Sequence, residues 1–248
     1  MSDFTIRVAG RTVAVRARFE TSRRFCEKYL REGEPDFTVA ISQTDIEYER
    51  EKSAQEDVRE GLPVRNLPDA YLETIAIQRK ITHQLFTCDT LLFHGSVVAV
   101  DGAAYIFTAK SGTGKSTHTR LWREMLGDRA MMVNDDKPFL VIKKGKVLAY
   151  GTPWSGKHRL DTNTAVPVKA VCILERGADN TIAPIPARDA LAMLFQQSCR
   201  PEDPGLMPKY MDLIDGLARN VALYRLQCNM EPDAARVSYE AMSGEKMQ

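Results

Sequence analysis

The chain has 248 residues, which is enough for one large domain or for one domain with a small appendage. Hydrophobic residues make up 44% and charged residues 27%, a balance that excludes a largely disordered chain. The 34 basic and 33 acidic residues give a formal net charge of +1, so nothing in the charge indicates nucleic acid or an anionic membrane as a partner.

Five cysteines occur, an odd number, and no two of them form a CxxC pair. This spacing argues against a disulfide framework and against a zinc site, and favours reduced thiols. The N-terminus has no apolar signal core and no run reaches the length of a membrane span. We therefore expect a cytoplasmic protein without a membrane partner.

The N-terminal region is expected to be a small β-rich unit. Residues 3–17 alternate apolar and polar side chains around a Gly10-Arg11 turn and predict a hairpin. A short helix over 20–32 and a strand over 36–42 follow. The charged segment 45–60 fits a strand, a helix or a loop, and the sequence does not decide among them. Breakers at 61–63 place the boundary after residue 62, giving units 1–62 and 63–248.

The remainder alternates helical and β patterns, which predicts the α/β class. Helices are expected over 68–88, after the phosphate loop described below, and over 187–197, 209–220 and 233–242. Strands are expected over 91–100 and 103–109 with an Asp-Gly turn between them, over 129–136, in a hairpin over 139–151, and over 168–177.

Residues 109–116 read AKSGTGKS and match the phosphate-loop pattern GxxxxGK[ST], with Ala109 in place of the first glycine. A β pattern precedes the segment and a helical pattern follows it, which is the context that this loop requires. The alternative is a chance turn before a helix, which this context disfavours. The predicted nucleotide-binding residues are Lys110, Ser111, Gly112, Thr113, Gly114, Lys115, Ser116 and Thr117.

Each residue type in this loop has a physical role. Gly112 and Gly114 lack a Cβ atom, so the backbone can curl and direct several N–H groups to one point. The positive end of the following helix adds to that field. Lys115 supplies an ammonium for phosphate oxygens, and the Ser116 hydroxyl is a suitable ligand for Mg²⁺. We expect a nucleoside triphosphate, ATP with Mg²⁺.

Asp135 and Asp136 end the predicted strand 129–136. In phosphate-loop enzymes a carboxylate at a strand end commonly holds the metal, so one aspartate can serve Mg²⁺ while the other accepts a proton from an attacking hydroxyl. A surface Asp-Asp turn is the competing interpretation. His94 precedes the loop by one hairpin and could reach the same cleft or could be a structural histidine.

A second unusual segment, residues 151–159, reads GTPWSGKHR and combines turn formers, a tryptophan and basic side chains. Such a loop suits contacts with anions or nucleotides, although it could equally be a solvent loop in which Trp154 closes the core. We take Lys157 and Arg159 as candidate substrate ligands, and Arg200 as a weaker candidate.

The sequence resembles the HPr kinase/phosphorylase family and, more distantly, ATP-dependent phosphoenolpyruvate carboxykinase. The resemblance lies in the order of six short segments, HGS, DG, AKSGTGKST, NDD, GTPWSGKH and ILERG. The resemblance covers roughly residues 90–180. It implies a twisted mixed β-sheet flanked by helices, ATP and Mg²⁺ as cofactors, and phosphorylation of a serine hydroxyl on a partner protein. By position it implies that Lys115 binds phosphates, Ser116 and Asp135 hold the metal, Asp136 is the catalytic base and His94 lies beside it.

The sequence departs from that family at two places. Thr117 stands where an acidic residue usually follows the loop serine, and the ExRGxG motif is absent, since Glu175-Arg176-Gly177 only partly resembles it. The resemblance therefore implies the nucleotide half of the site and leaves the acceptor open.

Three functions follow from these observations. The first is a kinase that transfers the γ-phosphoryl group of ATP to a hydroxyl of a small molecule, or of a serine on a peptide or protein, with catalytic residues Asp136, His94 and Lys115. The second is a nucleotide-binding regulatory module without phosphotransfer. The third is a carboxykinase-like lyase, for which the chain is short. A homo-oligomer is possible, since the resembled family forms hexamers.

Overall fold

The computed structural model describes residues 2–247. Contacts divide the chain into two units, Met1–Gln84 and Leu85–Gln248. The sequence places its boundary after residue 62 instead, ahead of a helix that the contacts group with the first unit. Within the described residues, no helix has both the length and the apolar character needed to cross a membrane.

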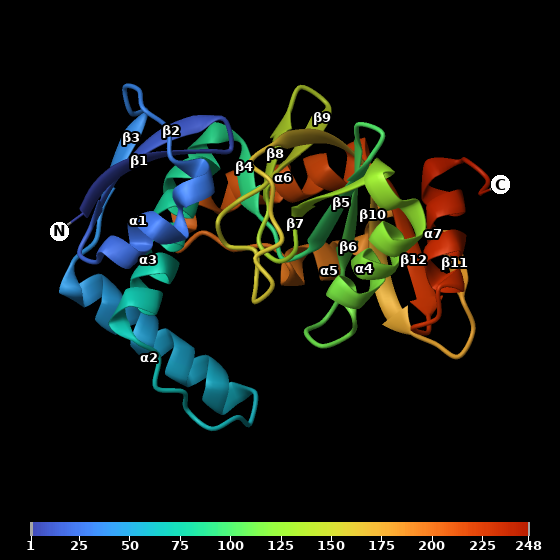
Figure 1. The fold of residues 1–248 in the computed structure, drawn as a ribbon, viewed down its shortest axis with the longest axis horizontal. Coiled ribbons are helices and arrows are strands. Elements are labelled where there is room, and N and C mark those ends of the chain that lie inside the picture. The colour runs from blue at the N-terminus through green and yellow to red at the C-terminus, as the bar shows by residue number, and fades with distance from the viewer. Residues whose placement is uncertain (1, 248) are drawn as a thin grey trace. The chain divides into compact units, whose positions relative to one another are not determined.

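The first unit contains a three-stranded sheet (Figure 1). Strands β1 (Ser2–Val8) and β2 (Arg11–Ala17) form the expected antiparallel hairpin, and β3 (Phe37–Ala40) pairs with β2 in parallel. The helix expected over 20–32 is shorter. Helix α1 (Glu20–Phe25) is followed by a 3-10 turn (Glu27–Tyr29), and Leu30 then forms an antiparallel bridge with Ile6, because the chain returns to the sheet.

Two long helices complete this unit, and they explain where its boundary falls. Helix α2 (Gln43–Arg59) begins at a capping box in which Ser42 and Asp45 bond each other's backbone N–H groups. Helix α3 (Asp69–Leu85) carries the buried Glu73. That carboxylate accepts bonds from the N–H groups of Arg18 and Phe19 and from the hydroxyl of Ser22. Glu73 thus ties α3 to residues 18–22, which follow β2, and this explains why α3 groups with the first unit.

The second unit is built on a mixed sheet with strand order β4-β8-β9-β10-β6-β5-β7. Strand β12 pairs with β10, and β11 pairs with β12. The β10–β6 and β10–β12 pairs are parallel and the others are antiparallel. The strands are β4 (Thr90–Leu92), β5 (Ser96–Val100), β6 (Ala103–Thr108), β7 (Ala130–Asn134), β8 (Phe139–Lys143), β9 (Lys146–Tyr150), β10 (Ala165–Arg176), β11 (Thr181–Pro184) and β12 (Ala222–Cys228).

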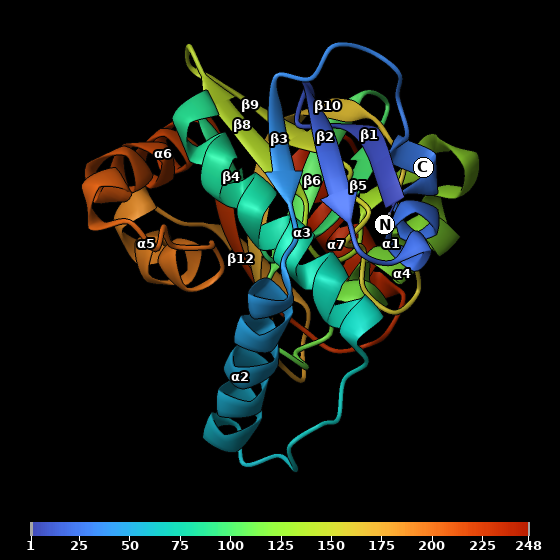
Figure 2. The same cartoon turned by 90° about the vertical axis from the view of Figure 1, so that its left-hand side faces the viewer.

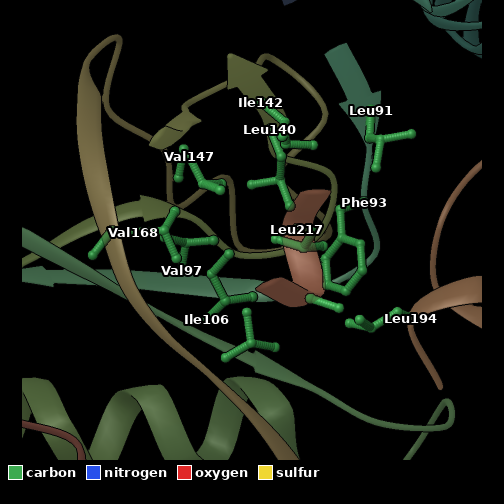
Figure 3. Close-up of a cluster of buried hydrophobic side chains, with 14 of the residues drawn as sticks. Leu91, Phe93, Val97, Ile106, Leu140, Ile142, Val147, Val168, Leu194 and Leu217 are labelled. Atoms are coloured by element: carbon green, nitrogen blue, oxygen red, sulfur yellow. The ribbon is translucent and has the colours of Figure 1, made fainter. Parts of the chain in front are cut away.

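Helices cover both faces of this sheet. Helices α4 (Lys115–Leu126) and α7 (Asp233–Ser243) lie on one face, and α5 (Ala187–Gln196) and α6 (Met207–Asn220) lie on the other (Figure 2). Side chains alternate along the central strands to serve both layers. Ile106 joins the core under α5 and α6, together with Leu194 and Leu217 (Figure 3), whereas Phe107 joins the core under α4 and α7.

The apolar run 91–100, expected as one strand, is broken at its middle. Residues 90–92 pair with β8 and residues 96–100 pair with β6 and β7, so His94 and Gly95 lie in the break. A Cβ atom on Gly95 would come within 3.2 Å of the carbonyl oxygen of Phe107, which explains why glycine stands there. Strands β11 and β12 were not expected from the sequence.

Candidate functional site

A curled loop connects strand β6 to helix α4. Gly112 and Gly114 both adopt positive φ angles, +74° and +122°, which glycine tolerates more readily than other residues. The N–H of Thr113 donates to the carbonyl of Lys110 at 3.3 Å and closes the turn. The strand–loop–helix arrangement is the one expected of a phosphate loop.

The start of helix α4 leaves backbone donors free. Its N-cap, Gly114, provides no side-chain cap, so the first N–H groups of the helix have no internal partner. The N–H groups of Gly112 and Gly114 donate to no backbone carbonyl within residues 2–247. Free N–H groups together with the positive end of a helix dipole are the features that favour anions at helix starts.

Lys115 folds back across the loop. Its Nζ donates to the carbonyl of Ala109 at 3.2 Å, which places the ammonium over the curled backbone. Burial lowers the pKa of Lys115, while the charges of Asp136 and Asp135 act in the opposite direction. The ammonium of the loop and both carboxylates therefore interact within one site.

Asp135 is buried and is connected to helix α4 through two hydroxyls. Ser96 donates to Oδ1 of Asp135 at 2.5 Å, and the Ser96 oxygen lies 3.0 Å from the hydroxyl of Thr119. The Thr119 hydroxyl also donates to the backbone carbonyls of Lys115 and Ser116, both at 3.3 Å. Thr119 is the fifth residue of α4, so this series of hydrogen bonds joins the strand-end carboxylate to the start of the helix.

The side-chain oxygen atoms of Ser116 and Asp135 are of a kind that suits Mg²⁺. Ser116 and Asp135 provide hard oxygen atoms, and Oδ2 of Asp135 accepts no hydrogen bond from residues 2–247. No group of three or more His, Cys, Asp or Glu side chains suited to a metal occurs in the same range. Mg²⁺ commonly uses one or two protein ligands and takes the rest from phosphates and water, so a larger cluster is not required.

His94 and Asp136 form a pair at the edge of the loop, with Nε2 and Oδ1 3.2 Å apart. Burial lowers the pKa of His94 below 6.5 although the hydrogen bond to Asp136 opposes this. For Asp136, burial raises the pKa, but the His94 bond and the nearby Lys137 and Lys115 outweigh it and bring it below 3.8. The pair is therefore a neutral imidazole that donates to an ionised carboxylate.

Asn134 fixes the position of this carboxylate and was not recognised from the sequence. Its Oδ1 accepts from the N–H groups of Asp136 and Lys137, at 2.9 and 2.7 Å. Its Nδ2 donates to the carbonyl and the hydroxyl oxygens of Thr152, both at 3.0 Å. Asn134 is fully buried, so it anchors the Asp136 turn to the loop after β9.

The loop after β9 lies against Asp136. A Cβ atom on Gly156 would be 3.4 Å from the Cβ of Asp136, and the N–H of Lys137 donates to the carbonyl of Trp154 at 3.1 Å. Trp154 is buried, whereas Lys157 and Arg159 are exposed beyond it. Lys157 and Arg159 thus come one and three positions after Gly156, the glycine that packs beside the Asp136 side chain.

Comparison with known proteins places the chain in a family. The model of a family described as SynChlorMet cassette protein ScmC matches residues 69–232. The chain belongs to the ScmC family. The matched region contains all the candidate site residues, from His94 to Arg200, and omits the first unit's sheet.

Other comparisons add little to the ScmC assignment. No curated protein matches the chain. A solved structure described as the Hpr(Ser) kinase/phosphatase from Coxiella burnetii is similar over 49% of this chain and 86% of that chain, at 10% identity and a TM-score of 0.29. A similarity of this size supports no functional assignment, so the function of this ScmC-family chain has to be argued from its own site.

Arg176 and Arg200 have different environments in this ScmC-family chain. Arg176, at the end of β10, donates from Nη2 to the carbonyl of Gly112 at 2.6 Å and so holds the loop from outside, a role that sequence reasoning missed. Arg200 is exposed and follows Cys199, whose N–H bonds the carbonyl of Leu92. The carbonyl of Gln197 accepts from the N–H of His94 at 2.6 Å. Within residues 2–247, no hydrogen bond or ion pair links the Arg200 side chain to His94 or Asp136.

Proposed function

We propose that this chain is an ATP- and Mg²⁺-dependent phosphotransferase that transfers the γ-phosphoryl group to a hydroxyl of a small molecule or of a serine side chain on a peptide or protein. The observation that carries the proposal is the convergence of three groups. The Lys115 ammonium, the Ser96-bound Asp135 and the His94-bound Asp136 meet beside an uncapped helix start.

The phosphate loop supplies charge neutralisation. Its free N–H groups and Lys115 would bind the phosphate oxygens, and their arrangement before the reaction removes the need to reorganise solvent. Ser116 and Asp135 are the residues that would hold Mg²⁺, which supplies further positive charge to the phosphates. These residues account for nucleotide binding, and they assign no acceptor.

Asp136 would orient the acceptor and take its proton. Because its pKa is held below 3.8, the carboxylate is ionised at neutral pH and can accept a hydrogen bond from a hydroxyl. A weak base of this kind contributes chiefly by orientation, and the proton moves to it as the oxygen–phosphorus bond forms. His94 and Asn134 hold Asp136 in place and do not themselves need to touch the acceptor.

The exposed Lys157 and Arg159 indicate where an acceptor would approach. They follow Gly156, which lies against Asp136, so an acceptor at the carboxylate would pass beside their positive charges. A phosphate or carboxylate group on the acceptor would be attracted there.

A label-transfer experiment tests this function. ATP labelled in the γ-phosphoryl group would be incubated with Mg²⁺, the protein and, in separate reactions, a metabolite extract or serine-containing peptides. We expect labelled acceptor and ADP from the unchanged protein and neither from Lys115→Ala. Release of free phosphate alone, or no ADP at all, would contradict the proposal and would favour a regulatory module.

A further inference from the structure

A cavity of about 420 Å³ opens beside the phosphate loop. Gly112, Gly114 and Thr117 form its wall on the side of the loop, and Leu121 and Leu174 form part of its apolar wall. This volume is within the usual range of small-molecule sites, which are mostly apolar with a few polar groups. None of the residues already assigned to metal binding or proton transfer lines it.

Helix α4 separates this cavity from the carboxylates. Thr117 and Leu121 are four residues apart and both line the cavity, so they share one face of the helix. Ser116 and Thr119 lie on the opposite face at 3.6 residues per turn, and Thr119 reaches Asp135 through Ser96. The loop therefore has the reacting groups on one side and the cavity on the other.

We infer that this cavity binds the nucleoside of the nucleotide, with the aromatic base between Leu121, Leu174 and Met230. The inference rests on the proposed function, because it extends a triphosphate whose terminal phosphate lies at Lys115 and Asp136. Such a chain of phosphates, followed along the loop away from the carboxylates, leads to Thr117 and into the cavity. The triphosphate and the nucleoside then occupy one continuous site.

Met230 is the second observation. It lines the cavity together with Leu121 and Leu174, and 77% of its surface is exposed, so its side chain lies at the solvent edge of the cavity. Methionine is flexible and polarizable, and it forms favourable contacts with aromatic rings. An aromatic nucleotide base packed against Leu121 and Leu174 would provide an apolar surface for Met230 to contact.

Arg176 marks the junction of the two parts of the site. It lines the cavity and also donates to the carbonyl of Gly112 on the loop. Its positive charge therefore lies where the phosphates would meet the nucleoside, a position suited to a negatively charged linkage. Its neighbour Gly177 donates its N–H to the carbonyl of Cys228, which closes the far wall of the cavity.

The test compares ATP with inorganic tripolyphosphate, each with Mg²⁺, by calorimetric titration of the full chain. Tripolyphosphate carries the phosphates without a nucleoside. Cys228→Phe would fill the cavity, and Met230→Ala would remove its cover, with Met211→Ala as the matched control, since Met211 is an exposed methionine on α6. We expect the Kd for ATP to rise about tenfold in the two cavity variants, a loss typical of apolar contact area, while the Kd for tripolyphosphate stays within about twofold.

The outcomes separate the inference from the proposed function. If the unchanged protein binds neither ligand, both fail. If it binds ATP no more tightly than tripolyphosphate, or if Met230→Ala binds ATP as tightly as Met211→Ala does, the cavity does not hold the nucleoside and only the phosphate site remains. If Cys228→Phe weakens both ligands, the fold of that variant is in question, and a selective loss of ATP in Met230→Ala still supports the inference.

Discussion

Nε2 of His94 lies 3.2 Å from Oδ1 of Asp136, and the two residues come from separate parts of the second unit. His94 lies in the break between β4 and β5, and Asp136 follows β7. The N–H of Gly95 also donates to the carbonyl of Asp136 at 3.0 Å. Side-chain and backbone bonds therefore act together to fix the carboxylate that we propose as the base.

Asp136→Asn tests the role of that carboxylate. The amide has the same shape but cannot accept a proton, so we expect turnover to fall by about 10²- to 10⁴-fold, the usual contribution of a positioned acid or base. ATP binding should change little, because the phosphates are held by the loop. Steady-state kinetics and a titration with ATP measure the two quantities. Asp212→Asn, at an exposed position on α6, is the control, and full turnover in Asp136→Asn would exclude the assignment.

His94→Ala tests how the carboxylate is kept ionised. The bond from His94 is the strongest of the effects that lower the pKa of Asp136, so its loss should raise that pKa. Asp136 must be ionised to accept a proton. As the pH is lowered, the variant should therefore lose activity at a higher pH than the unchanged protein does. The acid limb of the kcat/KM profile measures this shift. An unchanged acid limb would show that His94 does not tune Asp136.

Ser96→Ala tests the metal site. Ser96 donates to Asp135 at 2.5 Å, and a partner of this kind orients a metal ligand, so its removal should raise the Mg²⁺ concentration needed for half-maximal activity by about 10- to 100-fold. Thr119→Val is the matched control, because it removes the next hydroxyl in the chain but leaves the bond to Asp135 intact. Equal Mg²⁺ requirements in the two variants would contradict a specific role for Ser96.

The sequence predicted the parts of the site that are local. The candidate phosphate loop can be proposed from the sequence because its glycines, lysine and serine lie within eight consecutive positions between a strand pattern and a helix pattern. Asp135 and Asp136 could also be proposed from the sequence, because they are adjacent and end a predicted strand. Residues 45–60 stayed ambiguous, although Ser42 and Asp45 form the capping box that starts α2 and could have been read as a helix signal.

The remaining contacts depend on topology and could not be predicted. Asn134 bonds Thr152 across 18 positions, and Arg176 bonds Gly112 across 64. Such pairs form only because β10 lies parallel to β6 and because the loop after β9 returns to β7. The same reason explains why the cavity beside the loop was missed, since Leu174 and Met230 reach it from β10 and from the segment after β12.

Asn134→Asp tests the connection between the two loops of the site. The substitution replaces a buried donor by an acceptor that faces the carbonyl of Thr152, so we expect a loss of about 2 to 4 kcal/mol in the free energy of unfolding. Asn220→Asp is the control, because Asn220 is exposed at the end of α6, where its side-chain amide donates to the carbonyl of Gly216. Chemical denaturation of both variants measures the difference. An equal loss in the free energy of unfolding in both variants would mean that the buried bonds of Asn134 contribute no more to stability than the exposed bond of Asn220.

His118→Gln tests a pH dependence of stability that comes from the core under α4. Burial lowers the pKa of His118 from 6.5 to about 4, and Nε2 lies 2.9 Å from the hydroxyl of Ser238. Between these two pH values the unfolded chain binds a proton that the folded chain does not, so stability falls as the pH falls through this window. At pH 4.5 the unchanged protein should have lost about 2 to 3 kcal/mol from this group relative to pH 7.5.

Glutamine at position 118 can donate to Ser238 but does not titrate. The variant should therefore lose less stability than the unchanged protein between pH 7.5 and 4.5, and the other titrating groups cancel in the comparison. Denaturation curves at the two pH values measure this, and His158→Gln, at an exposed position after β9, should behave as the unchanged protein does. If His118→Gln lost as much stability on acidification as the unchanged protein, the buried imidazole would not be the group responsible.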